Sequence, residues 1–452
     1  MNETMDPKLP DRPSLKRVLG LFSCTMLVVG NMIGVGIFTT PGRIAAALPS
    51  SGLILLAWVL GALLAMAGAL SYAELGASYP EAGGNYVFLR EAYGSLWGFL
   101  YGWAAAFITQ SGTVAILAVG FTKYAGVTNS LHVQLIAVSL ILFFGALNYI
   151  GVKVGAGVVD VITFLKILSI LVFALAGTLF GKGRFSNGAP YGPAQGGWWI
   201  AAGMATALIP IMYAYSGWNA TVYVGSEVEN PSRIIPLSLI GGVTLTAALY
   251  LILNVLYIYA MPVPAMSGVI AIAKTASESM FGPTAAKVLS GMIAFSVLGC
   301  LNATLLTAPR IPFAMARDGY FFALFGRVHP KFKTPGAAIG LVTLWAALLA
   351  LWGGIDPKNF YRLLDDYVTV PSLLLNALTV GGLFVLRKTR PHLPRPYKAW
   401  GYPVLPMCFI AVILWMVFNE FLQDSRAALA GIVMVATGAP FYLYFRKKIS
   451  SS

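Results

Sequence analysis

The part of the chain best suited to bind a small charged molecule is the glycine-rich stretch 30–38, GNMIGVGIF. It lies within an apolar run of membrane-spanning length, yet Gly34 and Gly36 each disfavour a helix by about 0.8–1 kcal/mol relative to alanine. An opened helix would expose N–H groups on one side and carbonyls on the other, which lipid cannot satisfy. Such a break would suit the carboxylate and ammonium groups of a zwitterion. The alternative is that Gly30 and Gly34 form a small-residue face for close helix packing.

Lys166 is the second residue with evident chemistry, because it lies in the middle of the apolar segment 161–168, VITFLKIL. A charged side chain at the centre of a membrane costs roughly 2.5–3.5 kcal/mol on insertion scales, so such residues usually have a partner or a task. We therefore expect a functional role for Lys166. The alternative is a long side chain that extends to the cytoplasmic surface.

A second interruption occurs at 210–219, PIMYAYSGWN, where Pro210 and the pair Ser216-Gly217 fall inside another apolar run. A proline within a membrane helix kinks it and frees a carbonyl. If the chain consists of two inverted halves, the two interrupted segments occupy matching positions, and such pairs mark the binding site of secondary transporters. The two segments together favour a binding site over two tolerated kinks.

The composition is that of a protein that crosses a membrane many times. Of 452 residues, 58% are hydrophobic and 10% are charged, whereas about a quarter of a globular chain is charged. No His-Glu-x-x-His or phosphate-loop motif occurs, which argues against an enzyme. Cys24, Cys300 and Cys408 lie in apolar segments without metal-ligand spacing, so we expect them to pack in the core. We expect no cofactor and no metal.

Twelve apolar runs are long enough to cross about 30 Å of hydrocarbon. They are residues 16–45, 51–77, 95–121, 132–150, 158–179, 199–224, 236–260, 285–314, 336–352, 361–386, 402–421 and 427–445. The formal net charge is +14, but the basic residues gather in groups that flank these runs on one side. We therefore expect a multi-pass protein of the cell membrane, partnered by the lipid bilayer and not by nucleic acid, with cytoplasmic tails at 1–15 and 446–452. The outer connection 261–283, which contains residues 267–270 (SGVI), is expected to hold a short interfacial helix.

Several motifs resemble the amino acid–polyamine–organocation (APC) superfamily and, within it, the L-type amino acid transporter (LAT) family. They lie at 34–38 (GVGIF), 41–42 (PG), 71–76 (SYAELG), 83–91 (GGNYVFLRE), 213–219 (YAYSGWN), 227–233 (EVENPSR), 316–319 (ARDG) and 395–403 (RPYKAWGYP). The resemblance implies an all-α integral membrane protein with twelve transmembrane helices and the LeuT-like, or APC, fold. Residues 16–181 (helices 1–5) and 198–386 (helices 6–10) would form a five-plus-five inverted repeat, and 402–445 would add two C-terminal helices.

The resemblance also implies how a substrate would be held. Its carboxylate would meet the backbone amides of Gly34, Val35 and Gly36, where an opened half-helix carries partial positive charge. Its ammonium would meet carbonyls of the two interrupted segments. The implied substrate-binding residues are Met32, Ile33, Gly34, Val35, Gly36, Gln110, Tyr213, Ala214, Ser216 and Asn219.

Some of these roles have structural alternatives. Tyr213 would be an aromatic gate or a core aromatic, whereas Trp218 is expected to pack. Gln110 would line the site or bond to another helix, and Asn219 would bind substrate or stabilise a helix. By resemblance, Lys166 lies where sodium-coupled relatives bind their cation, so its ammonium would replace that ion and serve coupling.

The chain departs from the family pattern at three of the positions that matter here. Val35 stands where a small hydroxyl residue is common, which removes one hydrogen bond to a carboxylate. Tyr213 stands where many relatives have phenylalanine, and Pro309 stands where a small residue is usual before an arginine. These departures bear on substrate choice more than on membership of the family.

We expect alternating-access transport of neutral L-amino acids without sodium, because the site shows no carboxylate to receive a cationic side chain. Exchange and proton-coupled uptake are both open, as are a homo-oligomer and a partner subunit. A cationic amino acid or polyamine transporter is the alternative, which a carboxylate from the tenth run reaching the site would favour. A non-transporting membrane sensor is more remote, because no output domain is evident.

The acidic residues have less specific roles in this interpretation. Glu74 and Glu227 are expected at cytoplasmic helix ends, where they cap helices or pair with basic loops during gating. Four further carboxylates fall near the ends of apolar runs and are expected at the membrane interface. They are Asp160, Asp365, Asp366 and Glu420.

Overall fold

The computed structural model describes residues 14–189, 197–355 and 357–450. Within these ranges the chain is helical and has no strand, only two isolated bridges that join Leu19 to Val228 and Ala82 to Val224. The expected all-α class is therefore confirmed.

The first half of the chain forms helices in the order that the apolar runs predict. Their bounds are α1 Leu21–Met32, α2 Gly36–Ala47, α3 Ser51–Ser78, α4 Asn85–Tyr93, α5 Ser95–Ala104, a π-helical turn Ala105–Thr109, α6 Gln110–Tyr124, α7 Ser130–Ile150 and α8 Val152–Phe180. A short 3-10 turn follows at Phe185–Gly188.

The second half is built in the same way, with more interruptions. Its helices are α9 Trp198–Ala214, α10 Ala220–Tyr223, α11 Pro231–Ala260, α12 Val263–Met266, α13 Ile272–Phe281, α14 Pro283–Thr307, α15 Arg310–Arg317, α16 Gly336–Ile355, α17 Pro357–Thr389, α18 Val404–Gln423, α19 Ser425–Ala436 and α20 Gly438–Ser450. Short 3-10 turns lie at Gly225–Glu227 and Ala323–Gly326.

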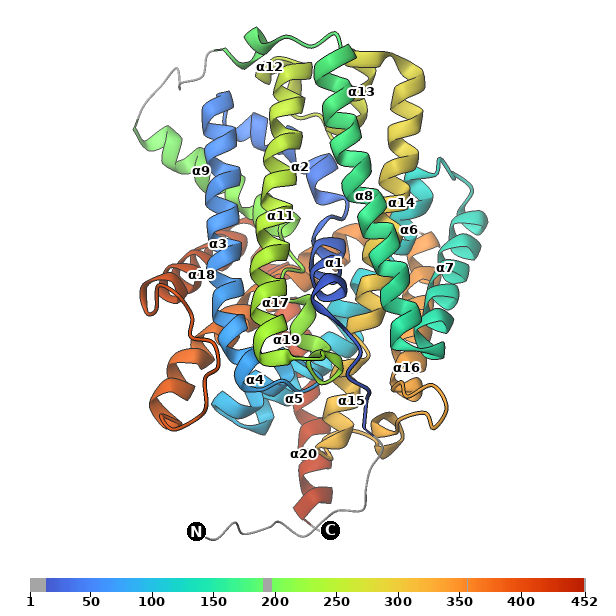
Figure 1. Cartoon of the computed structure of the whole chain (residues 1–452), viewed down its shortest axis with the longest axis vertical. Helices are drawn as coiled ribbons and strands as arrows, with labels where there is room; N and C mark the ends of the chain where they lie inside the picture. Colours follow the sequence, from blue (N-terminus) through green and yellow to red (C-terminus); the bar gives the residue numbers. More distant parts are fainter. Residues whose placement is uncertain (1–13, 190–196, 356, 451–452) are drawn as a thin grey trace.

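The number of membrane crossings agrees with the expectation in part. In the described residues, ten helices are long and apolar enough to span, and α1 with α2 makes an eleventh if the bent pair counts as one. The sixth expected span is represented by α9, which is apolar but shorter than the others. A count of twelve and the inverted repeat thus remain predictions. Both ends of the described chain lie at the same end of the bundle (Figure 1), as an even number of spans requires.

The first glycine-rich stretch does interrupt its helix. Helix α1 ends at Met32, α2 begins at Gly36, and the two are bent by 45°. A Cβ at Gly34 would make only an ordinary contact, with Cys300 Sγ at 3.7 Å, so Gly34 acts through its low helix propensity. A Cβ at Gly36 would lie 2.8 Å from the Cα of Ala214. Gly36 is therefore required sterically, since here the two interrupted segments touch.

The second interruption lies within the expected stretch 210–219, at its Ser216-Gly217 pair and not at Pro210. Helix α9 continues through Pro210 and ends at Ala214, and turns occupy residues 215–219 before α10. The chain turns at Gly217, whose φ of 94° is a left-handed conformation that glycine adopts at little cost. The proline is absorbed within the helix, and the glycine marks the break.

Helix α1 lies at the centre of the bundle, where it packs against α8, α11 and α14 (Figure 1). Helices at the periphery expose large apolar side chains. Examples on α7 and α8 are Leu135, Phe143, Val161, Phe164 and Leu175. Such a surface is unfavourable in water and suits the hydrocarbon of a bilayer.

The expected short helix in the connection 261–283 is present, since α12 and α13 both lie there, on either side of a turn at residues 267–270. This turn docks on the middle of α2, where the Gly268 N–H donates to the Gly42 carbonyl over 2.9 Å. A smaller expectation, on the cysteines, was wrong in part. Cys24 and Cys300 are buried as expected, but Cys408 is exposed, because α18 lies at the edge of the bundle.

Candidate functional site

The carbonyls at the end of α1 are held by side chains from three neighbouring helices. Lys166 of α8 donates from Nζ to the Ile33 carbonyl over 2.6 Å and to the Gly30 carbonyl over 3.2 Å. Ser296 of α14 donates to the same Ile33 carbonyl over 3.1 Å. Lys166 is 2% exposed, so its side chain does not extend to the cytoplasmic surface, and that alternative is wrong.

Gly30 also serves the packing role that was its alternative. A Cβ at this position would collide with the hydroxyl of Thr163, and it would lie 3.4 Å from a methyl group of Val159. Both residues belong to α8. The absence of a side chain at Gly30 therefore lets α8 approach α1 closely enough for Lys166 to reach the break.

Tyr250 of α11 joins the two interrupted segments, and its position was not predicted, because a hydroxyl in an apolar run is its only signal. Its Oη lies 2.8 Å from the Met32 carbonyl at the end of α1 and 2.8 Å from the Ala214 carbonyl at the end of α9. A phenol has one hydrogen, so it serves only one carbonyl at a time. Both carbonyls belong to the set expected to bind a substrate ammonium.

Contacts between α14 and the end of α1 were likewise not predicted from the sequence. On α14, Ser296, Cys300 and Thr304 recur every four residues and thus share one face. Thr304 donates to the side-chain Oδ1 of Asn31 over 3.1 Å, and Cys300 Sγ lies 3.3 Å from the Asn31 carbonyl. The four-residue spacing of polar side chains in an apolar helix is the signal that would have found this face.

The start of α2 is where the substrate carboxylate is expected, and that role stays a prediction. Helix α2 begins at Gly36, and the first N–H groups of a helix have no intrahelical partner. The Gly34 N–H, however, donates to the Met32 carbonyl over 2.9 Å. Gly34 and Val35 are partly exposed, so an anion can approach the backbone here. Free N–H groups at the start of a helix are suited to bind a carboxylate.

The remaining predicted residues are more scattered. Ser216 is exposed in the turn after α9, and Tyr213 at the end of that helix is 49% exposed. Gln110 begins α6, and no described contact joins it to the break; its neighbours Ser111 and Thr113 bond to carbonyls of their own span. Their roles in binding stay predictions.

Asn219 is part of a buried polar network on the inner side of the break. Its amide donates to Tyr223 Oη over 3.1 Å, and that phenol shares hydrogen bonds with Tyr101 and Asn85. Asn85 in turn donates to Asn376 of α17. This network supports the helix-stabilising alternative for Asn219.

Trp218 packs as expected. It is 5% exposed and lies edge-on to Tyr72 at a ring distance of 4.7 Å. Its other aromatic neighbour is Phe409 of α18, at 6.1 Å. The indole thus anchors the turn after α9 against α3 and α18.

Below this network the inner end is closed by ion pairs and backbone bonds. Glu227 receives two hydrogen bonds from Arg310, at 2.8 and 2.9 Å, and both side chains are fully buried. The Glu227 carbonyl also accepts from the N–H groups of Val18 and Leu19, just before α1. The start of α1 is therefore tied to the segment that follows α10.

A second group of ion pairs involves Glu74 at the end of α3. It pairs with Arg387 and Arg395 and accepts from the Ala399 N–H. The expectation that Glu74 and Glu227 pair with basic residues is confirmed, although Arg310 lies at the start of helix α15 and not in a loop.

The adjoining helix α4 is fastened in a similar way. Arg90 forms an ion pair with Asp318, which also accepts from Tyr86 Oη over 2.7 Å. Burial, together with the Asp318 carboxylate, raises the pKa of the Tyr86 phenol. Tyr86 therefore remains a hydrogen-bond donor at neutral pH.

Two helices broken at facing points, with side chains from three further helices gathered at one break, are typical of a membrane transporter. The comparison with known protein families shows which family of transporters this is. The amino acid permease family matches residues 19–440, and the chain belongs to that family. The resemblance to the APC superfamily and its L-type transporters is thereby confirmed.

Curated relatives match along nearly the whole chain. The Serine/threonine exchanger SteT of Bacillus subtilis is 28% identical over 447 residues, which is 97% of this chain and 98% of that protein. The mouse Large neutral amino acids transporter small subunit 2 is 30% identical over 441 residues, 95% of this chain and 81% of that protein. The human b(0,+)-type amino acid transporter 1 is 28% identical over 446 residues, which is 96% of this chain and 89% of that protein. Their names describe transport and exchange and not enzymatic chemistry.

Proposed function

We propose that this protein transports neutral L-amino acids across the cell membrane by alternating access and without sodium. Membership of the amino acid permease family and the names of three relatives support amino acid transport. The proposal includes cytoplasmic termini, twelve spans and an inverted repeat of residues 16–181 and 198–386. It adds that the substrate carboxylate binds near Gly36 and its ammonium near the carbonyls that Tyr250 contacts.

The observation that carries sodium independence is the position of the Lys166 ammonium. It lies among the carbonyls of Gly30 and Ile33 and the hydroxyl of Ser296. Oxygen groups of this kind are what a hard cation takes as ligands. A second positive charge at the same place would be repelled by the first, so the lysine supplies the charge that a bound cation would otherwise supply.

The choice of a neutral substrate rests on the carboxylates near the break. In the described part of the chain, Glu74 and Glu227 are both engaged by arginines on the inner side. A buried cationic side chain without a carboxylate would cost several kcal/mol. The side chains of Asp365 and Asp366, the expected marker of a cationic substrate, lie outside the described residues.

Purified protein in liposomes provides the test. Uptake of tritiated serine, threonine, alanine, leucine, arginine and putrescine is measured in sodium or choline buffer, with and without amino acids inside. We expect uptake of the neutral amino acids to dominate and to be equal in both buffers. Lys166→Ala should reduce uptake by about tenfold or more with little loss of monodisperse protein, because it removes the charge that the described residues place on the carbonyls of the break. Lys166→Arg should also be defective, since its guanidinium is larger and keeps its proton.

Several results would contradict the proposal. Putrescine or arginine uptake that exceeds every neutral amino acid would reverse the substrate choice. A strict sodium requirement, or normal transport by Lys166→Ala, would remove the role of the lysine. Protein-free liposomes and liposomes with heat-inactivated protein are the controls.

A further inference from the structure

Helix α20 ends in a cluster of positive charge that no acidic residue of its own balances. Its last turns hold Arg446, Lys447 and Lys448, and residues 425–452 contain no aspartate or glutamate. Arg446 and Lys447 are exposed, and within the described part of the chain neither forms an ion pair. We call these two residues the α20 basic pair. They have no part in the function proposed above.

The α20 basic pair lies where the apolar part of the helix ends. The run Ser425–Ser450 is long and apolar enough to cross a membrane. Leu443 and Tyr444, just before the pair, are 61% and 58% exposed. Tyrosine and basic residues at the end of a span prefer the level of the lipid headgroups. Helix α20 extends at the end of the bundle where both chain ends lie (Figure 1), which is the cytoplasmic side in the orientation proposed above.

The other face of α20 packs against the protein. Tyr442 and Phe445 are buried on this face. The ring of Tyr442 stacks on Tyr320 at a centroid distance of 5.7 Å, and the ring of Phe445 lies edge-on to Phe322 at 5.2 Å. Both partners belong to segment 318–322, which joins α15 to the 3-10 turn after it. The end of α20 and this segment are therefore packed together.

Segment 318–322 is also linked to the fastened inner end of the bundle. Its Asp318 forms an ion pair with Arg90 of α4. Just before α4, the Gly83 N–H donates to the Tyr223 carbonyl at the end of α10 over 3.0 Å. A series of contacts thus leads from α20 through Asp318 to the segment after α10, which holds the start of α1.

The surface formed by the α20 basic pair and the apolar residues before it suits an anionic phospholipid. Arginine and lysine donate charge-assisted hydrogen bonds to phosphate oxygens, and each basic residue near an anionic membrane surface raises the affinity by about fivefold. A free phosphate would meet the same two charges but would leave Leu443 and Tyr444 uncovered. The acyl chains beside a lipid headgroup would cover them.

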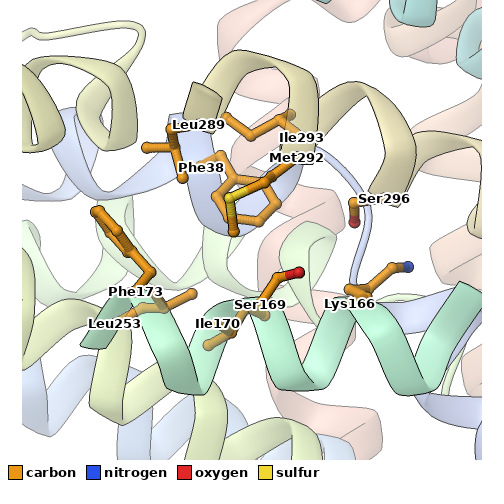
Figure 2. A pocket seen from close by; sticks show the side chains of 10 residues that line it. All are labelled: Phe38, Lys166, Ser169, Ile170, Phe173, Leu253, Leu289, Met292, Ile293 and Ser296. Carbon is orange, nitrogen blue, oxygen red and sulfur yellow. The ribbon is translucent and has the colours of Figure 1, made fainter. Parts of the chain in front are cut away.

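The cavity beside the break has no room for such a lipid. This cavity lies between α2, α8, α11 and α14, with Lys166, Ser169 and Ser296 on one side and Phe38 and Met292 on the other (Figure 2). The space open to the centre of a water is about 10 Å³, close to what one water needs and much less than an acyl chain occupies. A lipid would therefore act on the break from the surface of the bundle and not from this cavity.

We propose that the α20 basic pair binds the phosphate of an anionic phospholipid in the cytoplasmic leaflet and thereby stabilises the fastened state of the inner end; this rests on the orientation and the transport proposed above. The phosphate accepts hydrogen bonds from both basic side chains. The bound lipid holds α20 against segment 318–322, which keeps Asp318 in place for Arg90. A ligand that binds one state more tightly than another shifts the population toward that state.

Nanodiscs of phosphatidylcholine with or without phosphatidylglycerol provide the test, because they define the lipids around the purified full-length protein. Native mass spectrometry measures the phosphatidylglycerol that the protein retains, and hydrogen–deuterium exchange follows segment 318–322 and α4. The variant Arg446→Gln/Lys447→Gln removes the basic pair. The matched control is Lys388→Gln/Lys398→Gln, which removes two exposed charges at the same end of the bundle but outside α20.

We expect phosphatidylglycerol to slow exchange in segment 318–322 and in α4 of the wild type by about threefold or more. The variant without the basic pair should bind phosphatidylglycerol about tenfold or more weakly, and its exchange should be the same in both lipids. Lys447→Gln alone should lower the affinity by about fivefold. The control should resemble the wild type in both measurements.

Equal losses in the control and in the α20 variant would show a general effect of surface charge and would overturn the site. Lipid binding that leaves exchange unchanged would overturn the link to the inner end. Uptake of tritiated serine, threonine, alanine and leucine is measured in liposomes of the same two compositions. No uptake by the wild type in either lipid would instead overturn the proposed amino acid transport, whereas binding and exchange would still decide on the lipid site.

Discussion

At the scale of single residues, Tyr250 shows how a site made of backbone is kept in place. Its hydroxyl stands between the last carbonyls of α1 and α9, 2.8 Å from each, yet it has one hydrogen to give. When Tyr250 donates to one carbonyl, the other lacks its hydrogen, although the Met32 carbonyl also accepts from the Gly34 N–H over 2.9 Å. A substrate ammonium has three N–H donors and could bind both carbonyls. The tyrosine therefore links the two segments when the site is empty, and it competes only weakly with a substrate.

The first prediction is that Tyr250→Phe weakens binding more than it weakens the fold. Loss of one hydrogen bond costs about 0.5–1.5 kcal/mol, which would lower substrate affinity or uptake by about twofold to tenfold. Thermal unfolding in detergent and uptake in liposomes measure the two effects. Tyr257→Phe is the matched control on the same helix, because that buried hydroxyl has no partner in the described structure. If the two variants behaved alike, the bridging role of Tyr250 would be wrong.

At the scale of elements, the two broken helices meet where α2 begins and α9 ends. The Gly36 backbone rests on Ala214, and no side chain fits between them. The anion-binding start of one helix and the carbonyl end of the other are thus placed side by side. This contact makes one binding site out of two breaks that are distant in the sequence.

The second prediction follows from that contact. Even Gly36→Ala should separate the two breaks, since the added Cβ would lie 2.8 Å from the Ala214 Cα. We expect it to reduce uptake by about tenfold or more and to destabilise the protein by roughly 1–3 kcal/mol, as overpacking does. Gly291→Ala on α14 is the control, because open space surrounds that glycine. Wild-type uptake by Gly36→Ala would contradict the close contact.

Much of this arrangement could be predicted from the sequence, and the remainder has identifiable causes. Two glycines in an apolar run predict an open helix, and one lysine in another run predicts a partner for it, because lipid enforces both rules. Of the two signals in the stretch 210–219, Gly217 marks the break through its left-handed turn, whereas α9 continues through Pro210. Tyr250 and Ser296 are ordinary residues in apolar helices, and only the packing of α11 and α14 against α1 gives them a role.

At the scale of the whole molecule, ion pairs and backbone bonds fasten the end of the bundle at which both chain ends lie, whereas side chains beside the break are exposed. The buried pair of Glu227 and Arg310 fixes the segment after α10, and that segment holds Val18 and Leu19 through backbone bonds. Tyr213 and Ser216 beside the break are exposed. Transport by alternating access requires that this inner tie open, because α1 cannot move while its first residues are bonded to the Glu227 carbonyl.

The last prediction is that Glu227→Gln loosens the inner end and exposes α1. Removing one charge of a buried pair costs about 3–5 kcal/mol, because the other charge stays buried without its partner. The Arg310 guanidinium lowers this cost if it moves toward water, and that movement opens the inner end. Cys24 on α1 is fully buried behind Leu19, so its labelling by a charged maleimide reports this opening in protein that lacks Cys300 and Cys408. We expect labelling to accelerate by about tenfold or more. Glu81→Gln is the control, because that carboxylate pairs with Arg90 at an exposed position, where ion pairs contribute little. An unchanged labelling rate in monodisperse Glu227→Gln protein would show that the pair stabilises the fold without closing the route. Faster labelling that persists with saturating amino acid present would place the gate, and not the binding site, at this end of the molecule.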